Sequence, residues 1–195
     1  MLELLQSNIQ RTIGIPIPEE ICSRFSDLLY EKQFDKKDTL VEEGYYCKYI
    51  YFITEGSCYS YIKDEKGDIH AIQFGLEGYW ISDLYSFFSG KKSIYTIEAL
   101  EPTKVLVLTR EQFQKACDTM PIFDKYFRVL IQNAYVALQY RLAKTNSVEA
   151  EERYLEFSKL HPDFLQRIPQ YLIASYLGIK PQSLSRIRKE LTSKK

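Results

Sequence analysis

The sequence predicts an α+β protein, with an antiparallel β-barrel or jelly roll in the N-terminal part, then a long helix and an all-α C-terminal part. Two observations carry this prediction. From about residue 39 to residue 108 the chain consists of short β-branched and aromatic runs that glycine turns separate. Beyond residue 109 the apolar residues recur instead at steps of three and four, the spacing of an amphipathic helix.

The barrel part should begin with two helices, over residues 2–13 and 18–32, which prolines separate. The strands expected after them are Tyr49–Thr54, Cys58–Lys63, Ile69–Phe74, Ile94–Leu100 and Lys104–Leu108. Thr109 and Gln112 have the residue types and the spacing of a capping box, which predicts that another helix begins there. We therefore expect residues 1–120 to form one domain.

A long helix is predicted from Pro121 to about Thr145, and its length of about 36 Å exceeds what a small barrel can cover. Its apolar stripe comprises Phe123, Phe127, Leu130, Ala134, Ala137 and Arg141, widened by Tyr126, Ile131, Leu138 and Leu142. The small Ala134 and Ala137 side chains would let a second copy approach closely, as in a two-stranded coiled coil. We expect residues 121–146 to join two chains in a homodimer; the alternative is a helix packed wholly on its own barrel.

The segment from Arg167 to Leu191 predicts two short amphipathic helices joined by a tight turn at Gly178, which is the pattern of a helix-turn-helix. The apolar stripes that can pack together are Leu172, Ile173, Tyr176 and Leu177 in the first helix, and Leu184, Ile187 and Leu191 in the second. A helix-turn-helix inserts its second helix into the major groove. Residues 147–195 are therefore expected to bind double-stranded DNA.

The second of these helices carries polar residues opposite its apolar stripe. Arg186 can bond the O6 and N7 atoms of guanine, and Gln182 can bond adenine in the same bidentate way. Ser183, near the start of the helix, suits a base edge or a phosphate. The cations expected to contact backbone phosphates are Lys180, Arg188, Lys189, Lys194 and Lys195.

The distribution of charge supports this interpretation. The whole chain is neutral, with 26 basic and 26 acidic residues. From Leu165 onward there are seven basic residues and one acidic residue, so this segment has a net charge of +6 and residues 1–164 one of −6. Positive charge collected near a predicted recognition helix favours phosphate binding. The alternative is a solvated basic face on a C-terminal helix.

Composition and motifs exclude several other classes of protein. The chain is 45% hydrophobic and 27% charged, as in ordinary globular proteins, and no apolar stretch approaches the roughly 20 residues of a membrane span. With no signal-peptide core, we expect a cytoplasmic protein that does not bind membranes. No catalytic motif is present, so an enzyme is not expected. The cysteines and histidines do not cluster, which predicts reduced thiols and neither metal nor cofactor: Cys22, Cys47, Cys58, Cys117, His70 and His161.

In the order of its parts the chain resembles the Crp-Fnr family of bacterial transcription regulators over about residues 20–193. The barrel segments that carry the resemblance are Thr39-Leu-Val-Glu-Glu-Gly44, Tyr51-Phe-Ile-Thr-Glu-Gly56 and Gly78-Tyr-Trp-Ile-Ser-Asp-Leu84, and the helix-turn-helix adds Ala174-Ser-Tyr-Leu-Gly178 and Ser183-Leu-Ser-Arg186-Ile187. The resemblance implies a cyclic-nucleotide-binding-like sensor domain for an unknown small-molecule effector. It also implies a homodimeric, sequence-specific DNA-binding regulator, with RNA polymerase as a further partner.

The chain departs from the family in its sensor pocket. Relatives that bind cyclic AMP hold the ribose with a Gly-Glu pair and the phosphate with an Arg-Ser or Arg-Thr pair; here these pairs are Ser82-Asp83 and Ser93-Ile94. The degenerate pocket comprises Ser82, Asp83, Leu84, Lys92, Ser93 and Ile94. Burying a phosphate without its arginine is costly, so we predict no response to cyclic AMP. Lys91 or Lys92 offers a point charge but lacks bidentate geometry.

Two further expectations concern the C-terminus and a different class of function. The family's β-hairpin wing should be truncated, because four residues follow Leu191. The alternative function is a ligand-sensing module that signals through a protein partner and does not bind specific DNA. The salt dependence of DNA affinity distinguishes the two, because phosphate contacts make binding fall steeply with salt.

Overall fold

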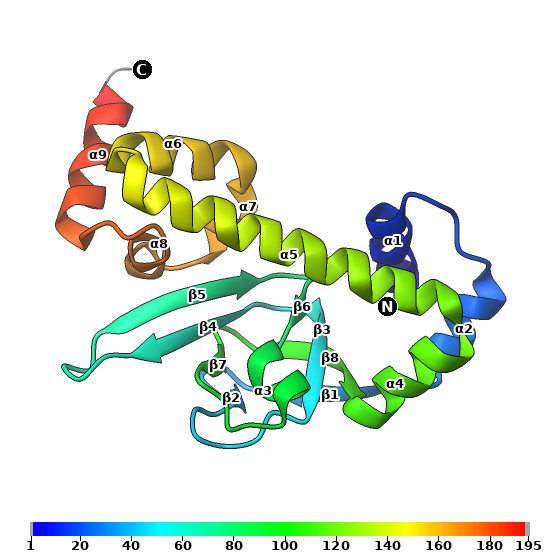
Figure 1. The fold of residues 1–195 in the computed structure, drawn as a ribbon. Coiled ribbons are helices and arrows are strands. Elements are labelled where there is room, and N and C mark those ends of the chain that lie inside the picture. The colour runs from blue at the N-terminus through cyan, green and yellow to red at the C-terminus, as the bar shows by residue number, and fades with distance from the viewer. Residues whose placement is uncertain (1, 194–195) are drawn as a thin grey trace. The chain divides into compact units, whose positions relative to one another are not determined.

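The computed structural model describes residues 2–193, which form two compact units (Figure 1). Unit 1 contains the described residues up to Ser60 together with Phe74–Ala134, and unit 2 contains Tyr61–Gln73 together with the described residues from Tyr135. Among residues 2–193 no helix is both long and apolar enough to cross a membrane. Each unit has its own set of buried side chains and is considered separately below.

Two four-stranded sheets confirm the predicted barrel or jelly roll (Figure 1). One sheet has the order β1-β8-β3-β6, with bounds Tyr30–Phe34, Thr103–Thr109, Tyr49–Glu55 and Trp80–Ile81. The other has the order β2-β7-β4-β5, with bounds Thr39–Val41, Thr96–Ala99, Cys58–Lys63 and Ile69–Gly75. Strand β3 lies between β8 and β6 and pairs antiparallel with both.

The predicted helix over residues 18–32 is wrong in its second half. Helix α2 (Glu19–Ser26) ends early, and Tyr30–Phe34 forms β1, which pairs antiparallel with β8 from Tyr30 opposite Val107 to Phe34 opposite Thr103. In β1 only Phe34 is buried, so the segment lacks the apolar alternation that marks a strand in the sequence. Pairing with β8, about 70 positions later in the chain, decides its conformation.

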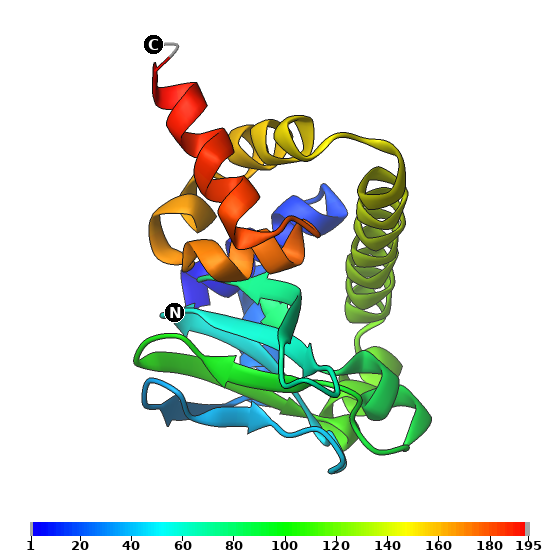
Figure 2. The same cartoon turned by 90° about the vertical axis from the view of Figure 1, so that its left-hand side faces the viewer.

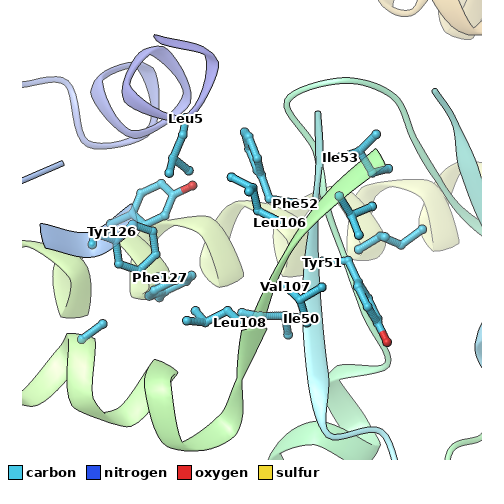
Figure 3. Close-up of a cluster of buried hydrophobic side chains, with 14 of the residues drawn as sticks. Leu5, Ile50, Tyr51, Phe52, Ile53, Leu106, Val107, Leu108, Tyr126 and Phe127 are labelled. Atoms are coloured by element: carbon cyan, nitrogen blue, oxygen red, sulfur yellow. The ribbon is translucent and has the colours of Figure 1, made fainter. Parts of the chain in front are cut away.

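The core of unit 1 forms where helices pack on the β1-β8-β3-β6 sheet. Figure 3 shows Leu5 from α1 (Leu2–Ile13) near Tyr126 and Phe127 from α5 (Pro121–Ser147), beside residues of β3 and β8. Along β3 all four residues from Ile50 to Ile53 are buried, as a strand covered on both faces requires. The predicted capping box forms at the start of α4 (Arg110–Thr119), where Thr109 and Gln112 exchange bonds of 3.0 and 3.1 Å.

A buried polar chain links three elements of this core. The indole N–H of Trp80 donates to the Tyr126 hydroxyl (2.6 Å), that hydroxyl donates to the Asn8 side chain, and the Asn8 amide donates to the Gly78 carbonyl (2.6 Å). Burial raises the pKa of Tyr126, so its hydroxyl stays protonated and able to donate. These hydrogen bonds orient α1 and α5 on β6, because each of the groups bonds to specific partners from another element.

Helix α5 differs from its predicted stripe. Its first turns belong to the core of unit 1, since Phe123 and Tyr126 are fully buried and Phe127 is nearly so. From residue 132 to 140 every residue is exposed, including Ala134 and Ala137. The large apolar side chains exposed on this helix are Tyr135, Val136, Leu138, Tyr140 and Leu142.

Unit 2 is largely helical (Figure 2). Its helices, after the end of α5, are α6 (Ala150–Leu160), α7 (Pro162–Arg167), α8 (Gln170–Tyr176) and α9 (Pro181–Ser193). The buried apolar side chains from α6 onward are Tyr154, Phe157, Phe164, Ile168, Leu172, Ile173, Ala174, Leu177, Ile179, Leu184 and Ile187. The predicted stripes of the two helices around Gly178 therefore do face a core, with Tyr176 and Leu191 half-buried at its margin.

Candidate nucleic-acid interface and sensor cassette

Helices α8 and α9 form the predicted helix-turn-helix. Gly178 follows α8 with φ +64°, a left-handed conformation that glycine adopts without strain. The Ile179 amide then donates to the Ala174 carbonyl (2.9 Å), which closes the C-terminal turn of α8. A Cβ atom at Gly178 would lie 3.0 Å from the Thr145 side chain, so both the conformation and the space favour glycine here.

The burial of Leu184 and Ile187 sets the orientation of α9, because it turns the opposite face of the helix toward solvent. Gln182 and Arg186 are exposed on that face, one turn apart, whereas Ser183 is half-buried at its flank. The predicted phosphate contacts Lys180, Arg188 and Lys189 are exposed, while Lys194 and Lys195 lie outside the described residues. The sequence reasoning did not single out Ser185, which is exposed between Gln182 and Arg186.

Arg153 in α6 supports the helix-turn-helix from behind, and the sequence reasoning missed it. Its guanidinium donates to the carbonyls of Leu177 (3.0 Å) and Gly178 (3.3 Å) at the end of α8. It also donates to the carbonyls of Thr145 (3.5 Å) and Val148 near the end of α5. A cation at helix C-termini satisfies carbonyls that have no partner within the helix and interacts favourably with the helix dipole.

Ser175 in α8 makes a second unpredicted contact within unit 2. Its hydroxyl donates to the Ile69 carbonyl (2.8 Å) and accepts from the Ala71 amide (2.9 Å). The Ser175 hydroxyl therefore hydrogen-bonds to a backbone carbonyl and to a backbone N–H group of β5. These partners lie more than 100 positions away in the chain, so the residue pattern around Ser175 contains no signal for them.

The sensor cassette (Ser82, Asp83, Leu84, Lys92, Ser93 and Ile94) lies in unit 1, and the structure brings its two halves together around the Asp83 side chain. Asp83 is fully buried and caps α3 (Leu84–Ser89) by accepting from the Ser86 amide (3.1 Å). Its second carboxylate oxygen accepts from the Ser93 hydroxyl (2.6 Å) and the Ile94 amide (2.9 Å). The hydrogen-bond donors of Ser93 and Ile94 therefore bind the carboxylate of Asp83, a side chain of the same cassette.

The rest of the cassette is also committed to contacts within the chain. The Ser82 hydroxyl donates to the Tyr49 carbonyl (2.8 Å), and Ser82 and Ser93 are both buried. Burial, together with the Asp83 carboxylate, raises the pKa of the nearby Tyr95. Leu84 is half-buried and Ile94 is 46% exposed, while Lys92 is exposed and its backbone bridges to Tyr46. A second anion at this site would meet the buried Asp83 charge.

Comparison with known proteins matches both parts of the chain. Residues 31–120 match the family model of the cyclic nucleotide-binding domain. The chain is 24% identical over 203 residues to the cAMP-activated global transcriptional regulator CRP of Salmonella typhimurium, covering 92% of this chain and 90% of that protein.

Solved structures share the fold. FixK2 from Bradyrhizobium japonicum superposes with a TM-score of 0.72 at 19% identity, covering 85% of each chain. The c-di-GMP responsive global regulator CLP of Xanthomonas campestris superposes with a TM-score of 0.70 at 12% identity, covering 91% of this chain and 93% of that one.

Proposed function

Since this chain belongs to the Crp-Fnr family of transcription regulators, we propose that it acts as a homodimer, reads a specific DNA sequence with α9 and does not respond to cyclic AMP. Members of this family are transcription regulators and not enzymes. In the proposed organisation, residues 1–120 sense, residues 121–146 dimerise and residues 147–195 bind DNA. RNA polymerase and a small-molecule effector are further proposed partners, and the cytoplasm is the proposed location.

The observation that carries this proposal is the exposed face of α9. Gln182 and Arg186 lie one turn apart on it, with Leu184 and Ile187 buried on the other side. Both are side chains that read a base through two hydrogen bonds, and a helix exposes such a pair to the major groove. The proposed roles are base contacts for Gln182, Ser183 and Arg186, and phosphate contacts for Lys180, Arg188 and Lys189.

The experiment that tests the proposal is selection of bound duplexes from a random DNA pool, with the purified full-length protein and no added ligand. Enrichment of a two-fold symmetric site is expected. Three phosphate contacts per chain, or six per dimer, predict that log K falls with log salt at a slope of about −5. No enrichment together with a flat salt dependence would contradict DNA reading and favour the alternative, a sensor that signals through a protein partner.

Replacing Arg186 with alanine is expected to weaken binding by about 1–3 kcal/mol at one base pair of the selected site and to relax specificity there. Lys180→Ala is the comparison variant, since a lost phosphate contact weakens all sequences alike and makes the salt slope shallower by about 1 per contact. Titration of matched and single-mismatch duplexes measures both effects. An equal loss on all duplexes for Arg186→Ala would show that Arg186 does not read a base.

The exposed apolar residues of α5 support dimerisation. Ile131, Tyr135, Leu138 and Leu142 follow one another at steps of four, three and four residues, which is the heptad spacing of a coiled-coil seam. We call these four residues the seam. Tyr135, Leu138 and Leu142 are 60%, 48% and 57% exposed in the single chain, so a second copy would remove a large apolar surface from water.

The variant Leu138→Lys is expected to dissociate the dimer. Each chain would lose the burial of one leucine, worth about 2 kcal/mol, and two lysines would be brought together at the symmetric contact. Two such losses correspond to a dissociation constant raised about a thousandfold. Sedimentation velocity measures this change. Ala143→Lys, at an exposed position away from the seam, should remain dimeric, and an unchanged Leu138→Lys dimer would exclude the seam as the interface.

The hydrogen bonds within the cassette support the proposed lack of response to cyclic AMP. The Asp83 carboxylate already uses the Ser93 hydroxyl and the Ile94 amide, so a cyclic phosphate would have to displace a buried anion with no arginine to replace it. We expect that cyclic AMP neither raises the unfolding temperature nor releases heat on titration. A ligand that binds the folded state must stabilise it, so a concentration-dependent rise in the unfolding temperature would refute the prediction.

A further inference from the structure

Unit 2 contains a cavity that the proposed DNA contacts do not use. Its volume is about 190 Å³, and it is lined by the second half of α5, by α6 and by the end of α8. The residues that line its wall toward α5 include Ala137, Arg141 and Lys144. At 100° per residue, these three lie about a third of a turn from the seam, so dimerisation through the seam would leave the cavity open.

Four of the residues that line this cavity carry aromatic rings. Tyr140, Phe157, His161 and Tyr176 contribute rings, and Phe157 lies 5.7 Å from Tyr176 and 5.2 Å from His161 between ring centroids. Burial lowers the pKa of His161, which favours the neutral imidazole near pH 7. The cavity therefore offers flat apolar surfaces to a planar ligand.

Among the charged groups of the cavity, Arg141 has N–H groups available for a ligand. Arg153 donates to four backbone carbonyls, and Lys144 pairs with Glu156 (3.4 Å), which also accepts from the Tyr140 hydroxyl. Arg141 stacks on the Tyr176 ring, with its guanidinium carbon 4.2 Å from the ring centroid. Within residues 2–193 its hydrogen bond runs from one guanidinium nitrogen to the Tyr176 carbonyl (3.3 Å), although a guanidinium carries five N–H groups.

We propose that this cavity binds a small aromatic carboxylate, with the aromatic ring among the side chains of Tyr140, Phe157 and Tyr176 and the carboxylate on Arg141. An apolar cavity of about 150 Å³ holds benzene, so about 190 Å³ suits one ring with a short acidic substituent. Arginine binds a carboxylate through two parallel hydrogen bonds, a geometry that neither a neutral amide nor an alcohol reproduces.

Isothermal titration of the full-length protein with benzoate and phenylacetate tests the proposal, with benzamide and acetate as probes that lack the charge and the ring. At least one of the two aromatic acids is expected to bind about tenfold or more tightly than either comparison probe. Absence of binding by both acids overturns the proposal, as does binding of benzamide that equals that of the tighter acid. The titration needs no DNA, so its failure is distinct from failure of the proposed DNA reading.

Two alanines on α5 provide a matched pair of variants. Ala137 lines the cavity, so Ala137→Phe should fill it and weaken aromatic-acid binding about tenfold or more. Ala143 is exposed and does not line the cavity, so Ala143→Phe should bind within about twofold of the unchanged protein. Equal binding by both variants places the ligand elsewhere and overturns the proposal. Circular dichroism checks that each variant folds, and Ala137→Leu replaces Ala137→Phe if the larger ring prevents folding.

The role of Arg141 has its own readout. In Arg141→Gln the preference for benzoate over benzamide should disappear while benzamide binding stays within about threefold, because the ring-binding walls remain. Retention of the preference would assign the carboxylate to another group and overturn the proposed geometry. Tyr176 and Leu177 end the first helix of the helix-turn-helix, so a ligand in this cavity would contact the proposed DNA-binding element directly.

Discussion

Replacing Arg153 with methionine is expected to lower the free energy of unfolding of unit 2 by about 2–4 kcal/mol. The guanidinium satisfies carbonyls at the ends of both α5 and α8, and methionine keeps most of the side-chain volume but none of the donors. Hydrogen bonds to a charged group contribute about 1.5–3 kcal/mol each, and Arg153 is half-buried, so the sum is reduced by solvent. Urea unfolding followed by far-ultraviolet circular dichroism, which is sensitive to the helices, measures the loss.

The control for this variant is Lys159→Met on the same helix. Lys159 is exposed, and substitutions of this kind stay within about 0.5 kcal/mol. If Arg153→Met and Lys159→Met unfold at the same urea concentration, the carbonyl contacts of Arg153 contribute nothing measurable. A large effect confined to Arg153 would also be expected to weaken DNA binding, because Leu177 and Gly178 begin the turn that sets the position of α9.

The second large effect is expected at Asp83. Asp83→Asn preserves the shape of the side chain, but one of its two carboxylate oxygens becomes an N–H₂ group. That group would face hydrogen-bond donors, which include the Ser86 and Ile94 amides and the Ser93 hydroxyl. Leaving such a buried donor without an acceptor costs about 1–3 kcal/mol, and the lost charge-assisted bonds add to it, so we expect unit 1 to lose about 2–4 kcal/mol. Trp80, the one tryptophan of the chain, lies in unit 1 and reports its urea unfolding by fluorescence.

Asp118→Asn is the matched control for the cassette variant, since Asp118 is an exposed aspartate in the same unit. It should unfold at nearly the same urea concentration as the unchanged protein. A stable Asp83→Asn protein would mean that the buried carboxylate is not needed to hold the cassette together. In that case the cassette could open to admit a cyclic nucleotide.

The structure gives a physical explanation for the cassette residues that differ from the family pattern. The sequence predicts that Ser82-Asp83 and Ser93-Ile94 cannot hold a cyclic phosphate, because the arginine is missing. The structure adds that the group in the position of that arginine, Ser93, donates to Asp83 instead. A buried carboxylate needs hydrogen-bond donors within the chain when no ligand supplies them, since a buried unpaired carboxylate is costly.

Local rules were sufficient for several elements. The capping box at Thr109, the turn at Gly178 and the apolar stripes of α8 and α9 depend on residues that are close in sequence, so spacing and residue type predict them. The apolar runs of β3 and β8 likewise predict buried strands wherever they pair. Even the exposed face of α9 follows from which residues must be buried.

Other features depend on contacts between residues that are distant in the sequence, and the spacing of residue types does not predict such contacts. Strand β1 exists because β8 offers it a partner, although its own sequence resembles a helix end. The apolar stripe of α5 is divided between the core of unit 1, which buries Phe123 and Tyr126, and an exposed stretch that begins at residue 132. Arg153 and Ser175 are ordinary polar residues until the fold brings carbonyls and amides to them. The sequence by itself determined the elements that follow from local spacing and the chemistry that they carry. The tertiary structure decided that residues 30–34 form a strand, which side chains are covered and which polar groups find partners. The physical reason is that burial and hydrogen bonding are set by neighbours that are remote along the chain.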